Sequence, residues 1–187
     1  SRFKKEGYIS SKPLISVSGL PMAVQALNDM PVADEQRYVL RADFDGLNKL
    51  ISELSHVSKK PSFEIIDTIT DGQASSCVLG SKKLDLDQPV TIAACDNGMI
   101  YDSAKFEYLM ADDSIDVVVW GARGYPGASR CPEMYGWIDT HNDADKINSI
   151  SVKKPLSNPD IDPIVIGAFT FKKLSYFLDA VKKMKSR

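Results

Sequence analysis

Short apolar runs alternate with helix-like segments over the first two thirds of the chain, and this alternation limits the fold more than any other feature. Residues 90–95 and 115–120 have no polar alternate face, which is typical of strands that helices cover on both sides. We expect further strands at 36–41 and 63–66. We expect helices at 21–30, 44–57, 71–79 and 103–110. This βαβα order predicts a largely parallel sheet with right-handed crossovers.

The pattern changes after Trp120. A loop punctuated by glycine and proline covers 121–132, and the strand-like stretches that follow it have no helices between them. These stretches are 134–140, 146–153 and 163–171. They predict a mixed or antiparallel extension of the sheet, with a last helix over 174–184. We find no repeat, low-complexity tract or flexible linker, so we expect one compact domain over residues 1–187.

Composition excludes several classes of function. The chain has 187 residues and a formal charge of -2, so no overall field attracts nucleic acid or an anionic membrane surface. No apolar run is long enough to cross a bilayer. The three cysteines are widely spaced and form no CxxC pair, which predicts neither a disulfide framework nor a zinc site. We therefore expect a protein of the reducing cytoplasm, with Cys77 and Cys95 as buried thiols in apolar runs.

Asp96 is the most informative single residue. It follows the apolar run 90–95, so it is expected at the carboxyl edge of the sheet, where ligands bind in open α/β folds. One carboxylate there can hold a magnesium ion whose other ligands are waters and phosphate oxygens. The alternative is a turn aspartate that bonds its own backbone before Gly98.

Two basic residues near the start are candidates for binding phosphate. Lys12 precedes Pro13, and an extended backbone before proline can aim its ammonium at a phosphate group. Arg2 stands at the beginning of the chain. Taken alone, Lys12 is more simply explained as a solvated surface cation, and Arg2 as a disordered residue at the start of the chain.

Other candidates for ligand contacts lie at helix starts and strand ends. Asp71, Gly72 and Gln73 offer backbone N–H groups and a polar side chain that suit a nucleobase edge, although a simple turn with Asp71 as helix N-cap explains them too. Lys154 is one of a pair of lysines after a strand-like segment. Gly136 lies in Tyr-Gly-Trp, where a glycine permits close approach by a ligand.

The chain has no Ser-His-Asp or Cys-His arrangement, no GxGxxG and no complete P-loop. The chain has only two histidines, so acid–base catalysis by an imidazole group is not expected. This pattern suits phosphoryl and nucleotidyl transfer, because there the substrate brings its own nucleophile and the protein supplies positioning, magnesium and cations.

Taken in order, these segments resemble the sugar-phosphate nucleotidyltransferase family, the group that includes glucose-1-phosphate thymidylyltransferase. Ser1-Arg2-Phe3 resembles the end of the glycine-rich loop of that family, and Ser11-Lys12-Pro13-Leu14 resembles its Pro-Lys-Pro-Leu motif. Asp71-Gly72-Gln73-Ala74 resembles the turn that contacts the nucleobase, and Cys95-Asp96-Asn97 resembles the Gly-Asp-Asn metal motif.

The second half of the chain continues the resemblance. The segment 132–137 is similar to the glycine segment that contacts the sugar, and Val152-Lys153-Lys154-Pro155 is similar to Glu-Glu-Lys-Pro. Ile166-Gly167-Ala168-Phe169 is similar to the strand that follows in the family. The match covers essentially the whole chain, and the order and spacing of the motifs are more specific than any one of them.

The resemblance implies a three-layer α/β/α sandwich with a mostly parallel mixed sheet, Rossmann-like and of the nucleotide-diphospho-sugar transferase type. It implies transfer of a nucleoside monophosphate from a nucleoside triphosphate to a sugar-1-phosphate or similar phosphorylated metabolite, with Mg²⁺ and release of pyrophosphate. The implied roles are catalytic for Arg2 and Lys12, and metal binding for Asp96. The remaining implied contacts are to nucleotide by Asp71, Gly72 and Gln73, and to the second substrate by Gly136, Lys154 and Gly167. A homo-oligomer is compatible with the resemblance.

Three departures from the family pattern stand out. The sequence begins inside the first motif and stops before the second metal-binding aspartate, so we expect a longer parent polypeptide. Lys153 stands where the family often has a glutamate that contacts the sugar, which favours a more anionic acceptor. Two alternatives stay open: a glycosyltransferase of related fold that uses a nucleotide-sugar donor, and a non-catalytic nucleotide-binding domain. The first usually carries Asp-x-Asp, which Asp96-Asn97-Gly98 lacks.

Overall fold

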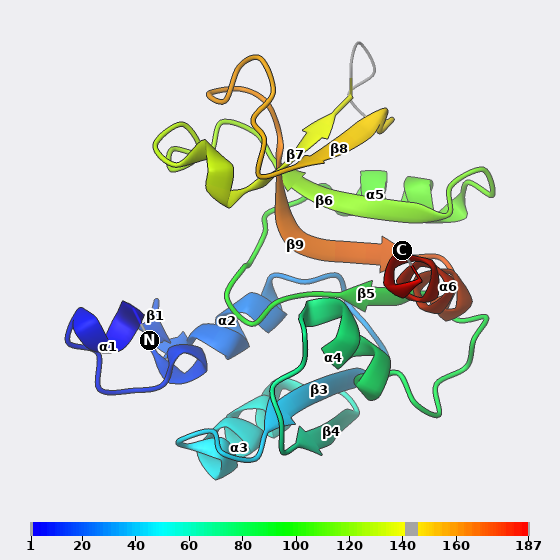
Figure 1. Ribbon diagram of the computed structural model, residues 1–187. Coiled ribbons are helices and arrows are strands. Elements are labelled where there is room, and N and C mark those ends of the chain that lie inside the picture. Colours follow the sequence, from blue (N-terminus) through cyan, green and yellow to red (C-terminus); the bar gives the residue numbers. More distant parts are fainter. Residues whose placement is uncertain (1, 141–145, 187) are drawn as a thin grey trace. The chain divides into compact units, whose positions relative to one another are not determined.

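The computed structural model describes residues 2–140 and 146–186 (Figure 1). The chain divides into two compact units, each described here by itself. The first unit contains Ser1–Asp116 and Phe171–Arg187, and the second contains Val117–Thr170. The elements of the first unit are α1 (Arg2–Lys5), η1 (Lys12–Leu14), β1 (Ser16–Val17), β2 (Leu20–Pro21), α2 (Met22–Asn28), β3 (Gln36–Arg41), α3 (Leu47–Val57), β4 (Pro61–Ile66), α4 (Gln73–Gly80), β5 (Val90–Ile92), α5 (Ser103–Ala111) and α6 (Leu174–Lys185).

The strands β3 and β4 form a parallel pair that is joined through α3, as the alternation of strands and helices predicts. Their register runs from Gln36 opposite Pro61 to Arg41 opposite Ile66. Figure 1 shows α3 alongside this pair. The helix begins after Gly46, whose φ of 89° is in the left-handed region that favours glycine.

Two apolar clusters hold the first unit together. In one, Ala23 and Val24 of α2 pack with Leu50 and Leu54 of α3, and Leu14 of η1 joins them. The other cluster lies at β5 and α6, and its buried members are Ile92, Leu174, Phe177 and Val181. Residues of α4 pack against this second cluster. The packing therefore fixes both the turn that carries Lys12 and the strand that leads to Asp96.

The second unit is built from antiparallel strands. Its elements are β6 (Val117–Ala122), η2 (Pro132–Met134), β7 (Gly136–Asp139), β8 (Ser149–Val152) and β9 (Ile164–Phe171), the last residue of which belongs to the first unit. The strand β7 pairs antiparallel with both β8 and β9. Its core is Trp137, which is fully buried among Ala128 and Ile164.

The mixed α/β class is confirmed, with a parallel pair in the first part of the chain and antiparallel pairs after residue 134. The prediction of a single nucleotidyltransferase domain over 1–187 stays a prediction. Two ranges differ. The strand expected at 90–95 ends at Ile92, and the helix expected from Phe44 begins at Leu47. The apolar pattern predicts which residues are buried, whereas the end of a strand or helix is set by where its backbone hydrogen bonds stop. The two need not coincide to the residue.

The cysteines give one correction. Cys77 is half-buried in α4. Cys95 as a whole residue is exposed, so the expectation of a buried residue there is wrong, although neighbouring groups partly desolvate its thiol. Because the chain leaves β5 at Ile92, Cys95 belongs to the loop that follows and not to the strand. In the described part of the chain, no helix has the length and apolar character needed to span a bilayer.

We expect Leu50→Ala to lower the free energy of unfolding by about 2–5 kcal/mol, because Leu50 is 2% exposed in the cluster between α2 and α3. Val57→Ala is the matched control, since Val57 ends the same helix with 46% of its surface exposed. Urea unfolding followed by circular dichroism measures both. Equal losses for the two variants would contradict the described core.

We expect Cys77 to react far more slowly with iodoacetamide than Cys131 at pH 8. Burial raises the pKa of the Cys77 thiol to about 11, so the reactive thiolate is scarce until the pH approaches that value, whereas Cys131 is exposed. Peptide mass spectrometry of labelling between pH 7 and pH 10 reports both rates. Labelling of Cys77 as fast as that of Cys131 at pH 8 would show that α4 is not packed as described.

Candidate functional site

The backbone around Lys12 is fixed locally. Leu14 N–H donates to the Ser11 carbonyl at 2.8 Å, and Ile15 N–H donates to the Lys12 carbonyl at 3.2 Å. The Ser11 hydroxyl also donates to the Asp45 carbonyl at 2.9 Å. Pro13 inside this turn restricts the backbone further, and Ile15 after it is buried. The turn therefore presents the Lys12 side chain from a defined position.

Asp96 follows β5, whose last residue Ile92 is buried against α6. Its carboxylate forms an ion pair with the Lys12 ammonium, although the two residues are 84 positions apart in the sequence. The side chains keep 37% and 29% of their surface exposed, respectively. The structure therefore brings together the predicted phosphate-binding lysine and the predicted metal ligand, at a place that a ligand can reach.

Phe3 is a third member of this site that the sequence does not predict. The Lys12 ammonium lies 5.8 Å from the centre of the Phe3 ring, a cation–π distance. Tyr8 meets the Phe3 ring edge-to-face at 5.6 Å, and its N–H donates to the Phe3 carbonyl at 3.0 Å. Arg2 belongs to the neighbouring helix α1, and its side chain lies outside the described residues.

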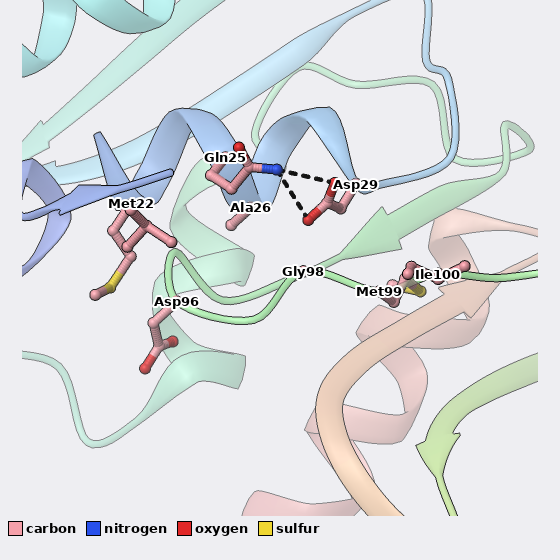
Figure 2. Close-up of a pocket in the computed structure, with 9 residues that line it drawn as sticks. Met22, Gln25, Ala26, Asp29, Asp96, Gly98, Met99 and Ile100 are labelled. Atoms are coloured by element: carbon pink, nitrogen blue, oxygen red, sulfur yellow. Dashed lines mark hydrogen bonds between the residues drawn. The ribbon is translucent and has the colours of Figure 1, made fainter. Parts of the chain in front are cut away.

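A pocket of about 290 Å³ lies beside Asp96, within the first unit (Figure 2). One wall is a face of α2 and the residue after it, formed by Met22, Gln25, Ala26 and Asp29. These positions follow helical spacing i, i+3, i+4 and i+7, which places them on one side of the helix. The other wall is the loop that follows Asp96, with Gly98, Met99 and Ile100. In Figure 2 the Asp96 carboxylate points away from Gln25 and Asp29.

The two walls touch at Asp29 and Gly98. The Gln25 amide donates to both carboxylate oxygens of Asp29, at 3.2 and 3.3 Å, and this holds the aspartate in place. A Cβ added to Gly98 would lie 3.0 Å from the Asp29 Cβ and would overlap the carboxylate. Only a glycine permits this close approach, so Gly98 sets the path of the loop that carries Asp96.

Cys95 does not offer a nucleophile to the site. Desolvation raises the pKa of its thiol, and the negative charge of Asp96 raises it further, against a smaller opposite effect of Lys12. The thiol therefore stays protonated at neutral pH. This agrees with a site that works through charge and positioning and forms no covalent intermediate on sulfur.

The turn before α4 differs from the simple capping interpretation. The N-cap of α4 is Gly72 and not Asp71, so Asp71 as N-cap is wrong. Gly72 has φ 154° and ψ 179°, an extended conformation with positive φ that a glycine adopts most easily. A hydrogen bond from Ser75 lowers the pKa of the exposed Asp71 carboxyl, and Lys185 lies 3.4 Å away. Gln73 is the first residue of the helix.

The three residues predicted for the second substrate lie in the second unit. Gly136 begins β7, and a Cβ there would lie 3.4 Å from Val165 Cγ2 of β9, which is ordinary contact. Lys154 follows β8, and its carbonyl accepts from the Ser151 hydroxyl at 2.6 Å. Gly167 lies within β9 with φ 81°. Gly136 and Gly167 therefore lie on the paired strands β7 and β9, and Lys154 lies just after β8, which pairs with β7.

The donor set bears on whether Mg²⁺ fits at Asp96. Among residues 2–140 and 146–186, no three carboxylate, histidine or cysteine side chains gather as they would around a metal ion. The site therefore offers Mg²⁺ one part-exposed carboxylate. This fits an ion that phosphate oxygens and waters also hold, which is how proteins commonly bind magnesium with nucleotides.

The sequence does not predict Phe3, Gln25, Asp29 or the role of Gly98. One signal for the pocket exists in the sequence, because Gln25 and Asp29 place polar groups at helical spacing on α2. The other wall comes from a loop about 70 positions later, and no local pattern connects the two.

We expect Gly98→Ala to destabilise the first unit by about 1–3 kcal/mol, because the added methyl group overlaps Asp29. The double variant Gly98→Ala/Asp29→Ala should recover most of this loss, since it removes the carboxylate that the methyl group meets. Thermal unfolding of the single and double variants measures the coupling. Additive losses would show that Gly98 and Asp29 do not touch.

Sequence comparisons identify no family model that matches this chain and no curated relative. Solved structures do match it. A nucleoside-diphosphate-sugar pyrophosphorylase from Vibrio cholerae RC9 matches with a TM-score of 0.75 and 18% identity, over 100% of this chain and 75% of that one.

Two further structures agree. CMP:2-keto-3-deoxy-manno-octonic acid synthetase, solved in complex with CTP, matches with a TM-score of 0.62 and 16% identity, over 94% of this chain and 74% of that one. HddC from Yersinia pseudotuberculosis matches with a TM-score of 0.62 and 21% identity, over 92% of this chain and 76% of that one. The chain is thus similar in fold to these three solved structures.

Proposed function

We propose that this protein is a nucleotidyltransferase that transfers a nucleoside monophosphate from a nucleoside triphosphate to a sugar-1-phosphate or similar phosphorylated metabolite. The observation that carries the proposal is the ion pair of Lys12 and Asp96. Two residues chosen for complementary roles toward a triphosphate meet in space from distant parts of the sequence. The fold similarity to a nucleoside-diphosphate-sugar pyrophosphorylase supports the same reaction class.

Each residue of the site has a role in the proposed reaction. The Lys12 ammonium neutralises charge on the triphosphate and on the leaving pyrophosphate, a task that Arg2 shares. Asp96 holds Mg²⁺ together with the phosphate oxygens. When bound, Mg²⁺ polarises the α-phosphate and offsets its negative charge. The part-exposed position of both described side chains leaves room for such a ligand.

We assign contacts to the nucleobase and to the second substrate to different residues. Gly72 and Gln73, with Asp71 beside them, contact the nucleobase through backbone N–H groups and the glutamine amide. Gly136, Lys154 and Gly167 contact the second substrate, and Lys154 provides a cation for its phosphate. We also propose the three-layer α/β/α arrangement and a cytoplasmic location, which suit this fold and these free cysteines.

The reaction is an in-line displacement. A phosphate oxygen of the metabolite forms a bond to the α-phosphorus, and the bond from that phosphorus to the bridging oxygen breaks. Pyrophosphate leaves with the electron pair of the broken bond. No protein group forms a covalent intermediate, so catalysis is positioning and charge stabilisation.

We expect the purified full-length protein to release pyrophosphate when it is given Mg²⁺, a nucleoside triphosphate and a phosphorylated sugar or polyol. Asp96→Ala and Lys12→Ala should each lower the rate by at least about a hundredfold, because each removes a charge that stabilises the transition state. A coupled pyrophosphate assay across the nucleoside triphosphates and a panel of acceptors measures this.

The matched controls are Asp34→Ala and Lys59→Ala, which break an exposed ion pair elsewhere in the first unit and should leave the rate unchanged. Full turnover in Asp96→Ala would disprove the assignment of the metal ligand. Consumption of a nucleotide sugar without any nucleoside triphosphate would instead indicate a glycosyltransferase. Tight nucleotide binding without turnover would indicate a non-catalytic binding domain.

A further inference from the structure

The Lys12 ammonium neutralises the Asp96 carboxylate through their ion pair. A free divalent cation that bound Asp96 would stand beside this ammonium, and positive charges at contact distance repel each other. Displacing Lys12 would leave its charge without this partner. The ion pair therefore opposes the uptake of a free cation.

A metal–nucleotide complex changes this balance. Its triphosphate offers the ammonium new anionic acceptors, and it brings the cation most of the ligands that a single carboxylate does not provide. Lys12 and Asp96 then exchange partners in one event, and neither side chain is left without a partner of opposite charge. The same ion pair that opposes the free metal thus accepts the complex.

Of the two carboxylates among the described residues that line the pocket, Asp96 is the one that pairs with Lys12. Asp29 is the other carboxylate lining the pocket, and the Gln25 amide hydrogen-bonds both its oxygens. No metal-binding group of three acidic, histidine or cysteine side chains occurs in the described part of the chain. The Phe3 ring, 5.8 Å from the ammonium, is a further attraction that keeps Lys12 near Asp96.

We infer that Lys12 is an internal counter-ion that keeps free divalent cations off Asp96, so that the metal enters the site together with the nucleotide. This rests on the proposed function in one respect, since it takes Asp96 as the metal ligand. Lys12 then has two successive roles. It first neutralises the Asp96 carboxylate, and it then neutralises charge on the triphosphate.

The test is a titration with Mn²⁺ alone, without nucleotide, in which electron paramagnetic resonance reports the free ion. Lys12→Gln should bind Mn²⁺ at least about tenfold more tightly than the unsubstituted protein, because the competing positive charge is gone. Lys12→Met should give the same gain. The double variant Lys12→Gln/Asp96→Asn should lose it, since the carboxylate is then missing.

Lys59→Gln is the matched control, because it breaks the ion pair with Asp34 in the same unit and should leave Mn²⁺ affinity unchanged. Equal melting temperatures of the variants show that the fold is retained. The inference is overturned if neither Lys12 variant binds Mn²⁺ more tightly, or if the gain survives the Asp96→Asn change. The titration contains no nucleotide, so its outcome is separate from that of the pyrophosphate assay, which tests the proposed function.

Discussion

The ion pair of Lys12 and Asp96 is the interaction on which the proposed chemistry of the first unit depends. A part-exposed ion pair contributes little to stability, so Lys12 and Asp96 do not hold their segments in place. The segments are held by other means. Backbone hydrogen bonds and the buried Ile15 fix the turn, and the cluster of β5 with α6 fixes the strand before the aspartate. The pair is thus a product of the packing and is free to open to a ligand.

The charge of the site is local. A chain with a formal charge of -2 has no overall attraction for a triphosphate, so the proposed binding depends on a few placed groups. Lys12 supplies one such group through its ion pair with Asp96, which lines the pocket. Gly98 lets the loop after Asp96 pass close to Asp29. A single methyl group at position 98 therefore bears on the place of a carboxylate two residues away.

The structural neighbours establish similarity of fold, at identities between 16% and 21%. Fold alone does not determine activity, because one fold carries many functions. The proposal for this protein consequently depends on its own residues. Lys153 is one residue that sets this chain apart, because it stands where the family that the sequence resembles often has a glutamate. It takes a left-handed φ of 58°, and its N–H donates to the Tyr135 carbonyl at 2.9 Å.

The sequence by itself determined the order of the strands and longer helices after residue 21, the range 36–41 of β3, and the change to antiparallel pairing. Local apolar periodicity and turn residues encode these features. The sequence also singled out Lys12 and Asp96 separately. Only the tertiary structure decided that these two residues touch, that α2 and the loop after Asp96 enclose a pocket, and that Gly72 is the cap of α4. The reason is that contacts between residues 84 positions apart depend on how the elements pack, and no local pattern records that packing.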